Sequence, residues 1–125
     1  MDAGAPAIRL AGFQPAPLNR LPGEAHSPGQ AFFLRTEDGL RLRLGLWQPE
    51  GEATGTVLLF PGRTEYLEKY APVAARLAAE GLAVLAIDWR GQGMSDRLLP
   101  DPRAGHIRDF ADYQTDVVEI VLAAD

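Results

Sequence analysis

The sequence has no cysteine among its 125 residues. This absence excludes a disulfide-stapled scaffold, thiolate zinc sites and a cysteine nucleophile. No apolar run approaches the roughly 20 residues of a membrane-spanning helix. Asp2 and Pro6 stand where a secretory signal would have a basic start and an unbroken apolar stretch. We therefore expect a cytoplasmic protein without a transmembrane segment.

Histidine is scarce, and positive charge is absent from the end of the chain. The two histidines, His26 and His106, lie in segments expected to be loops, so we interpret both as surface residues and expect no metal site and no cofactor. No Lys or Arg follows Arg108, and the formal net charge of −5 arises in the residues after it. Those acidic residues are Asp109, Asp112, Asp116, Glu119 and Asp125. Such a stretch offers no footprint for phosphates, so we expect a solvated helix face and no nucleic-acid binding.

Glycine and proline divide the chain into two regions. Residues 1–30 are rich in both, which predicts an irregular arm whose part nearest Leu18 is ordered against the sheet. The overall composition, 46% hydrophobic and 23% charged, is typical of a soluble globular domain. Residues 31–125 are therefore interpreted as the folded region.

A hairpin is expected at the start of the folded region. Asp38-Gly39 stands between two strand-like runs, residues 31–37 and 40–47, and predicts a type I′ turn with positive φ at both positions. In the second run, leucines at every second position alternate with Arg41, Arg43, Gly45 and Trp47. This alternation predicts an antiparallel strand at a sheet edge, buried on one face and wet on the other.

A strand-helix-strand unit is expected next. Residues 56–60 and 82–87 are apolar without alternation, which is typical of central parallel strands covered on both faces. Apolar residues at spacings of three and four predict a helix over residues 68–80, and Pro72 favours a start as late as Ala71. Gly81 suits a left-handed residue after that helix. A second amphipathic helix is expected after Asp109, which is placed to cap it.

Two motifs follow the two parallel strands, where an open α/β sheet places its ligand crevice. Residues 60–66 read Phe-Pro-Gly-Arg-Thr-Glu-Tyr, and residues 88–95 read Asp-Trp-Arg-Gly-Gln-Gly-Met-Ser. Together they resemble the monoacylglycerol lipase and bacterial lysophospholipase branch of the α/β-hydrolases. The resemblance covers residues 31–125. It implies an α/β fold that is the N-terminal half of an α/β-hydrolase: an antiparallel hairpin at the sheet edge, then parallel strands with crossover helices, incomplete at the C-terminus.

The resemblance also implies a function, that of a serine hydrolase acting on a lysophospholipid or a monoacylglycerol. It assigns the backbone N–H of Arg63 to the oxyanion hole and places four residues beside the substrate: Pro61, Gly62, Thr64 and Glu65. It assigns a structural role in the neighbouring loop to four others: Asp88, Arg90, Gly91 and Gly93. Pro61 stands where the family usually has His, which removes a polar anchor of the turn and stiffens it.

The nucleophile is expected outside these residues. Ser95 lacks the second glycine of the Gly-x-Ser-x-Gly elbow and is followed by a loop, so we do not interpret it as the nucleophile. Haloalkane dehalogenases and epoxide hydrolases share this first half and use an Asp nucleophile, and that alternative stays open. A dinucleotide site is disfavoured because no Gly-x-Gly-x-x-Gly follows the first parallel strand.

A third alternative is a non-catalytic interaction protein. An unpaired edge on strand 56–60 would be a template for association, so this chain by itself is expected to be inactive and to self-associate. The expected partner is a small-molecule ester or lipid, and peripheral contact with a membrane stays compatible with the sequence.

Overall fold

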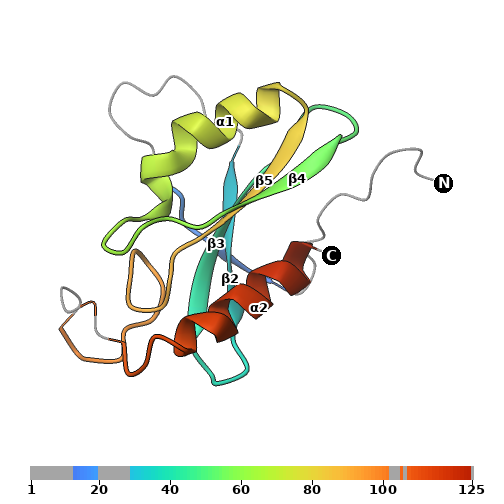
Figure 1. Cartoon of the computed structure of the whole chain (residues 1–125). Helices are drawn as coiled ribbons and strands as arrows, with labels where there is room; N and C mark the ends of the chain where they lie inside the picture. The colour runs from blue at the N-terminus through green and yellow to red at the C-terminus, as the bar shows by residue number, and fades with distance from the viewer. Residues whose placement is uncertain (1–12, 20–28, 102–104, 106, 125) are drawn as a thin grey trace.

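A computed structural model describes residues 13–19, 29–101, 105 and 107–124 of the chain. These ranges form a five-stranded mixed sheet in the order β1-β2-β3-β5-β4, with one helix on each face (Figure 1). The strands are β1 (Gln14–Ala16), β2 (Gln30–Arg35), β3 (Arg41–Trp47), β4 (Gly55–Leu59) and β5 (Leu82–Ile87). The helices are the 3₁₀ helix η1 (Leu67–Tyr70), α1 (Ala71–Ala79) and α2 (Asp112–Ala124). The α/β architecture with a β2-β3 hairpin and a parallel β4-β5 pair is confirmed.

Two hydrophobic clusters lie on opposite faces of the sheet. On one face, Leu44 and Ile87 pack with Ile120 of α2. On the other face, Trp47 and Val84 pack with the small residues of α1 and with Leu67. Helices α1 and α2 therefore pack against opposite faces of the sheet. The loops that follow β4 and β5 lie together at one end of it (Figure 1).

The expectation that β3 has a wet face is wrong. Every residue from Leu42 to Trp47 is buried, including Arg43 and Trp47 on the face expected to meet solvent. The reason is tertiary: α2 covers one face of the sheet and α1 with η1 covers the other, so both faces of β3 are buried, and the Arg43 charge is neutralised by buried carboxylates. The hairpin lies nearer the centre of the sheet than expected, with β1 outside it.

The arm and the hairpin turn also differ from expectation. Residues 14–16 of the segment expected to be irregular form β1, where Pro15 is tolerated because β1 is an edge strand. The type I′ turn is wrong, since Gly39 has positive φ and Asp38 does not. The N–H of Gly39 donates to the Thr36 carbonyl and the N–H of Thr36 to the Leu40 carbonyl, which is the longer hairpin loop with a left-handed glycine.

The strand β4 is less covered than predicted. Gly55 and Thr56 are exposed and residues 57–59 are half-buried, because β4 is the outer strand of the described sheet. The predicted association through this edge stays a prediction. In the described part of the chain, no helix is long and apolar enough to cross a bilayer.

The helices begin close to where the sequence places them. Helix α1 starts at Ala71, with Pro72 in its first turn, and Gly81 follows it with φ 93°, so both predictions are confirmed. Asp109 accepts the N–H of Ala111 at 2.9 Å ahead of α2. The solvated acidic face is wrong at one position, because Asp116 is fully buried.

Candidate functional site

The turn of residues 61–65 leaves the carboxyl end of β4 and leads into η1. Pro61 is buried, whereas Gly62, Arg63 and Thr64 are exposed. The indole N–H of Trp89 donates to the Pro61 carbonyl at 2.7 Å, and its ring stacks on Phe60 with the centroids 5.5 Å apart. Trp89 therefore supplies a polar anchor for a turn whose first residue has no polar side chain.

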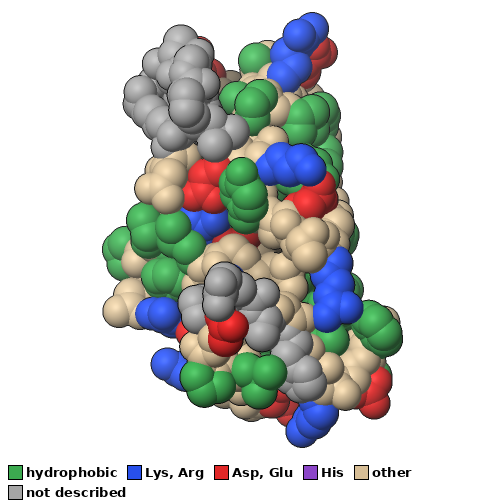
Figure 2. Space-filling view, turned by 90° about the vertical axis from the view of Figure 1, so that its left-hand side faces the viewer, with side chains coloured by type: hydrophobic (Ala, Val, Ile, Leu, Met, Phe, Trp, Pro, Cys, Tyr) green, Lys and Arg blue, Asp and Glu red, His purple; other side chains and the backbone are tan. Residues whose placement is uncertain are grey.

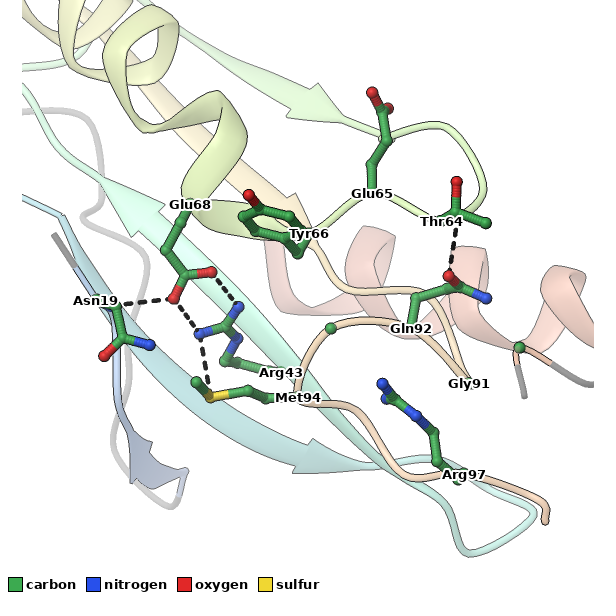
Figure 3. Close-up of a pocket in the computed structure, with 12 residues that line it drawn as sticks. Asn19, Arg43, Thr64, Glu65, Tyr66, Glu68, Gly91, Gln92, Met94 and Arg97 are labelled. Carbon is green, nitrogen blue, oxygen red and sulfur yellow. Dashed lines mark hydrogen bonds and ion pairs between the residues drawn. The ribbon is translucent and has the colours of Figure 1, made fainter. Parts of the chain in front are cut away.

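The three N–H groups in the middle of the turn differ in their partners. The Gly62 N–H donates to Glu65 Oε1 at 2.5 Å, and the Thr64 N–H donates to Gln92 Oε1 at 2.9 Å (Figure 3). The Arg63 N–H between them has no acceptor among the residues that the structure describes. Thr64 has φ 70°, a left-handed conformation that is strained for a β-branched residue. The turn thus presents one uncommitted donor between two occupied ones.

Glu65 closes the turn through its carboxylate. It accepts the Gly62 N–H, the Tyr70 hydroxyl at 2.6 Å and the ammonium group of Lys69. The hydrogen bonds from Lys69, Tyr70 and Gly62 lower the pKa of Glu65 from 4.5 to about 2. Any stabilisation from this depressed pKa is present above pH 4.5 and is lost as the pH falls through about 2. Glu65 is therefore an anion at every pH at which ester hydrolysis is normally assayed.

This pKa can be measured directly. The side-chain carboxyl carbon of Glu65, followed by NMR, is expected to titrate with a midpoint near pH 2 instead of 4.5. Lys69→Met and Tyr70→Phe each remove one donor and should move the midpoint upward, with the larger move for Lys69→Met because its hydrogen bond is the largest cause. A wild-type midpoint near 4.5 would show that the Glu65 contacts do not form in solution.

Asp88 lies at the end of β5 and joins three segments. Its carboxylate accepts Arg43 Nε at 2.7 Å, the Leu67 N–H at 2.9 Å and the Met94 N–H at 2.9 Å. Burial raises the pKa of Asp88, against the opposing charge and hydrogen bonds of Arg43. Gly93 crosses close above this carboxylate with φ 49°. A Cβ at Gly93 would lie 2.2 Å from Asp88 Cγ.

Arg43 forms a second, bidentate contact with Glu68. Nη1 and Nη2 each reach a Glu68 oxygen at 2.7 Å (Figure 3). Nη1 also donates to the Pro17 carbonyl at 2.9 Å. The backbone N–H of Asn19 adds a further bond to Glu68 at 3.0 Å. Burial opposes ionisation of Glu68, but Arg43 and the Asn19 N–H outweigh it, so the pKa of Glu68 lies below its ordinary value.

Arg90 makes the corresponding connection to α2. Its Nε donates to Asp116 Oδ1 and its backbone N–H to Asp116 Oδ2, at 2.9 and 3.0 Å, and its guanidinium also binds Asp38. Burial raises the pKa of Asp116, while Arg90 lowers it. The Gly91 N–H donates to the Asp96 carbonyl at 2.9 Å. The loop after β5 is therefore held from three directions, by β3, by α2 and by its own backbone.

Ser95 and the histidines stand apart from this arrangement. Ser95 is buried, donates its hydroxyl to the Asp88 carbonyl at 2.6 Å and accepts the Arg43 N–H at 2.9 Å. A hydroxyl fixed in this way has no access to a substrate. His26 and His106 lie outside the described residues. In the described ranges no group of three His, Cys, Asp or Glu side chains could hold a metal ion.

A pocket of about 520 Å³ lies between the 61–65 turn and the loop after β5. Its lining includes Thr64, Glu65, Tyr66, Gln92 and Arg97, and the Arg43–Glu68 pair also borders it (Figure 3). Figure 2 shows this side of the molecule, with charged side chains set back in a hollow between apolar ones. The lining is thus mostly polar and charged, with Tyr66 and Met94 as its large apolar side chains.

Sequence reasoning located the turn and the loop but missed the side chains that connect them. The family resemblance assigned no role to Gln92 or Trp89 of the second motif, and their contacts with Thr64 and Pro61 span 28 residues of sequence. One signal for Arg43 was available. It shares a strand face with Gly45 and Trp47, a composition that suits burial as well as solvent.

Comparison with known proteins identifies the family of the chain. Residues 51–125 match the model of the hydrolase family described as serine aminopeptidase, S33. The chain is 51% identical over 61 residues to lysophospholipase L2 of Escherichia coli, covering 49% of this chain and 18% of that protein. It is 34% identical over 83 residues to monoacylglycerol lipase of Mycolicibacterium smegmatis, covering 66% of this chain and 28% of that protein.

Solved structures share the fold. A soluble variant of monoglyceride lipase from Saccharomyces cerevisiae superposes with a TM-score of 0.66 at 19% identity, covering 81% of this chain and 33% of that one. An α/β-hydrolase from Novosphingobium aromaticivorans gives 0.58 at 26% identity, covering 79% and 32%. The chain spans about a fifth to a third of these relatives' lengths. On the match of residues 51–125, the chain belongs to the serine aminopeptidase S33 family of α/β-hydrolases.

Proposed function

We propose that this chain is the part of a carboxylic ester hydrolase that supplies one donor of the oxyanion hole, the backbone N–H of Arg63. The observation that carries the proposal is the 61–65 turn. There the N–H groups of Gly62 and Thr64 are occupied by side chains, and that of Arg63 has no acceptor within the described ranges. The turn follows the carboxyl end of β4, where ligands bind in open α/β sheets. In this proposal Pro61, Gly62, Thr64 and Glu65 lie beside the substrate, and Thr64 and Glu65 line the pocket next to the turn.

The mechanism follows from the charge that develops during acyl transfer. A serine hydroxyl, activated by a histidine and an aspartate, attacks the ester carbonyl and leaves negative charge on its oxygen. The Arg63 N–H donates to that oxygen, and removing one such donor costs about 2.7–4 kcal/mol of transition-state stabilisation. The second donor and the triad come from residues outside these 125. The roles of Asp88, Arg90, Gly91 and Gly93 are to hold the loop beside the turn.

The proposed substrate is a lysophospholipid or a monoacylglycerol, in a cytoplasmic enzyme. Support comes from the relatives, a lysophospholipase L2 and a monoacylglycerol lipase, and from a pocket beside the turn that has both apolar and polar lining. An Asp nucleophile remains the rival within this fold.

The enzyme that contains this chain is expected to hydrolyse one of these two lipids and to be labelled by a fluorophosphonate, which reacts with an activated serine. Arg63→Pro removes the N–H and should lower kcat by about 10²–10³-fold. Arg63→Ala is the matched control, because it keeps the backbone N–H and removes only the side chain, with its hydrogen bond to the Gly105 carbonyl.

Three outcomes would contradict the proposal. Absence of hydrolysis of both lipids would exclude the substrate class. Absence of fluorophosphonate labelling, together with incorporation of ¹⁸O from water into an aspartate, would assign an Asp nucleophile. Equal kcat for Arg63→Pro and Arg63→Ala, with active sites counted by titration, would remove Arg63 from the oxyanion hole.

A further inference from the structure

We propose that Gln92 is a positioning residue of the 61–65 turn: its amide oxygen holds the Thr64 N–H and thereby keeps the Arg63 N–H directed at the crevice. The inference rests on the proposed function, because it concerns the same donor. It assigns a role to a motif position that the family resemblance left without one. The supporting observations are the burial of Gln92, the fixed orientation of its amide and the backbone strain at Thr64.

Gln92 is a buried side chain that joins two loops. It is 5% exposed and extends from the loop after β5 to the turn after β4, where Oε1 accepts the Thr64 N–H at 2.9 Å (Figure 3). Strands β4 and β5 are parallel neighbours, so their carboxyl ends lie side by side. Gln92 therefore links the loops that follow two adjacent strands, at the edge of the sheet where the crevice is expected.

The orientation of the Gln92 amide follows from its partner. An N–H group needs an acceptor, so the oxygen faces Thr64 and the NH₂ group faces the other way. That NH₂ group is buried and has no acceptor among the described residues. It lies against Gly105, where a Cβ would come within 2.6 Å of Nε2. Burying a donor without an acceptor is unfavourable, so the NH₂ group does not account for the burial of this side chain. The favourable contact that Gln92 makes is the hydrogen bond that Oε1 accepts from Thr64.

The backbone of Thr64 needs such a contact. Its φ of 70° is strained for a threonine. A strained backbone conformation persists only where contacts with the surrounding structure hold it in place. Glu65 holds the turn on one side of Arg63 and Gln92 holds it on the other. Without the Gln92 oxygen, Thr64 is free to relax to negative φ. That change rotates the peptide unit between Arg63 and Thr64, which carries the Thr64 N–H. Arg63 shifts with it, and the Arg63 N–H, which belongs to the preceding peptide unit, is displaced from its position.

The test compares two substitutions in the enzyme that contains this chain. Gln92→Met is nearly isosteric but has no acceptor, and it should lower kcat by about 10–100-fold with KM unchanged, as a small misplacement of a catalytic group does. Gln92→Glu keeps an oxygen toward Thr64 and should retain kcat within about threefold, because the same hydrogen bond can form. Gln114→Met, on the exposed side of α2, is the matched control.

A second readout does not depend on catalysis. Thr64 in the wild type should show the strong intraresidue NOE between its amide and α protons that positive φ produces, and slow amide exchange. Both should be lost in Gln92→Met and kept in Gln92→Glu. If Gln92→Met does not fold, Gly105→Ala replaces it, since a Cβ there displaces the amide without removing it.

The outcomes separate the two proposals. Loss of the Thr64 signals in Gln92→Met with a wild type that hydrolyses no ester supports the positioning and overturns the proposed function. Wild-type esterase activity with unchanged kcat in Gln92→Met overturns the positioning, whatever the Thr64 signals do. An equal fall in kcat in Gln92→Met and Gln92→Glu also overturns the positioning, because loss of the acceptor oxygen would then not explain the fall.

Discussion

Replacing Arg43 by methionine is expected to lower the free energy of unfolding by about 3–5 kcal/mol, the range for breaking a buried ion pair. Arg43 is fully buried and is the cationic partner of both Glu68 and Asp88. Methionine fills much of the space but leaves two carboxylates without that partner in a place where burial opposes their ionisation. Equilibrium urea unfolding measures the difference.

Arg41→Met is the matched control on the same strand. Its guanidinium is 3.5 Å from Asp96, and both side chains are more than a third exposed, so the loss should be about 0–1 kcal/mol. Adding Glu68→Gln to Arg43→Met should recover part of the loss, because one uncompensated charge disappears. Equal destabilisation by Arg41→Met and Arg43→Met would show that the buried pairs do not support the fold.

Gly93→Ala is expected to destabilise the protein by about 3 kcal/mol or more. A left-handed backbone costs a non-glycine residue about 1–2 kcal/mol, and the new methyl group would lie 2.2 Å from Asp88 Cγ. Asp88 must then move, which weakens its charged hydrogen bonds to Leu67 and Met94, worth about 1.5–3 kcal/mol each. The measurement is again urea unfolding, and near-ultraviolet circular dichroism follows the packing of Trp89 beside this loop.

Gly51→Ala separates backbone strain from the steric conflict. Gly51 has φ 76° and nothing within 4 Å of the added Cβ, so only the backbone term of about 1–2 kcal/mol should appear. If Gly93→Ala costs no more than Gly51→Ala, the close approach of Gly93 to Asp88 does not occur in solution.

Local patterns were sufficient for the regular elements. The unalternating runs at residues 56–60 and 82–87 correspond to β4 and β5, and Pro72 and Gly81 mark the ends of α1 within a residue or two. These features depend on backbone dihedrals and nearest neighbours, which a short stretch of sequence determines. The 61–65 turn was found in the same way, from a Pro-Gly pair after a strand.

Patterns failed where burial depends on distant residues. The sequence pattern predicts that Arg43 faces solvent. In the structure it is paired with Glu68 and Asp88, which are 25 and 45 residues away along the chain. The pattern likewise predicts that Asp116 belongs to a solvated helix face, but in the structure Arg90 from the loop after β5 binds it. Charge alone cannot tell a wet side chain from one with a buried partner.

The sequence by itself determined the type of fold and the order of the elements, because periodicity, glycine and proline act locally. The segment that carries the candidate oxyanion donor was indicated by the family resemblance of its motifs. Only the tertiary structure decided which N–H of that segment is left uncommitted. The N–H groups of Gly62 and Thr64 are occupied by Glu65 and Gln92, and that of Arg63 has no acceptor in the part of the chain that the structure describes. That distinction requires two loops to meet at neighbouring strand ends, and a hydrogen bond across 28 residues has no local signature.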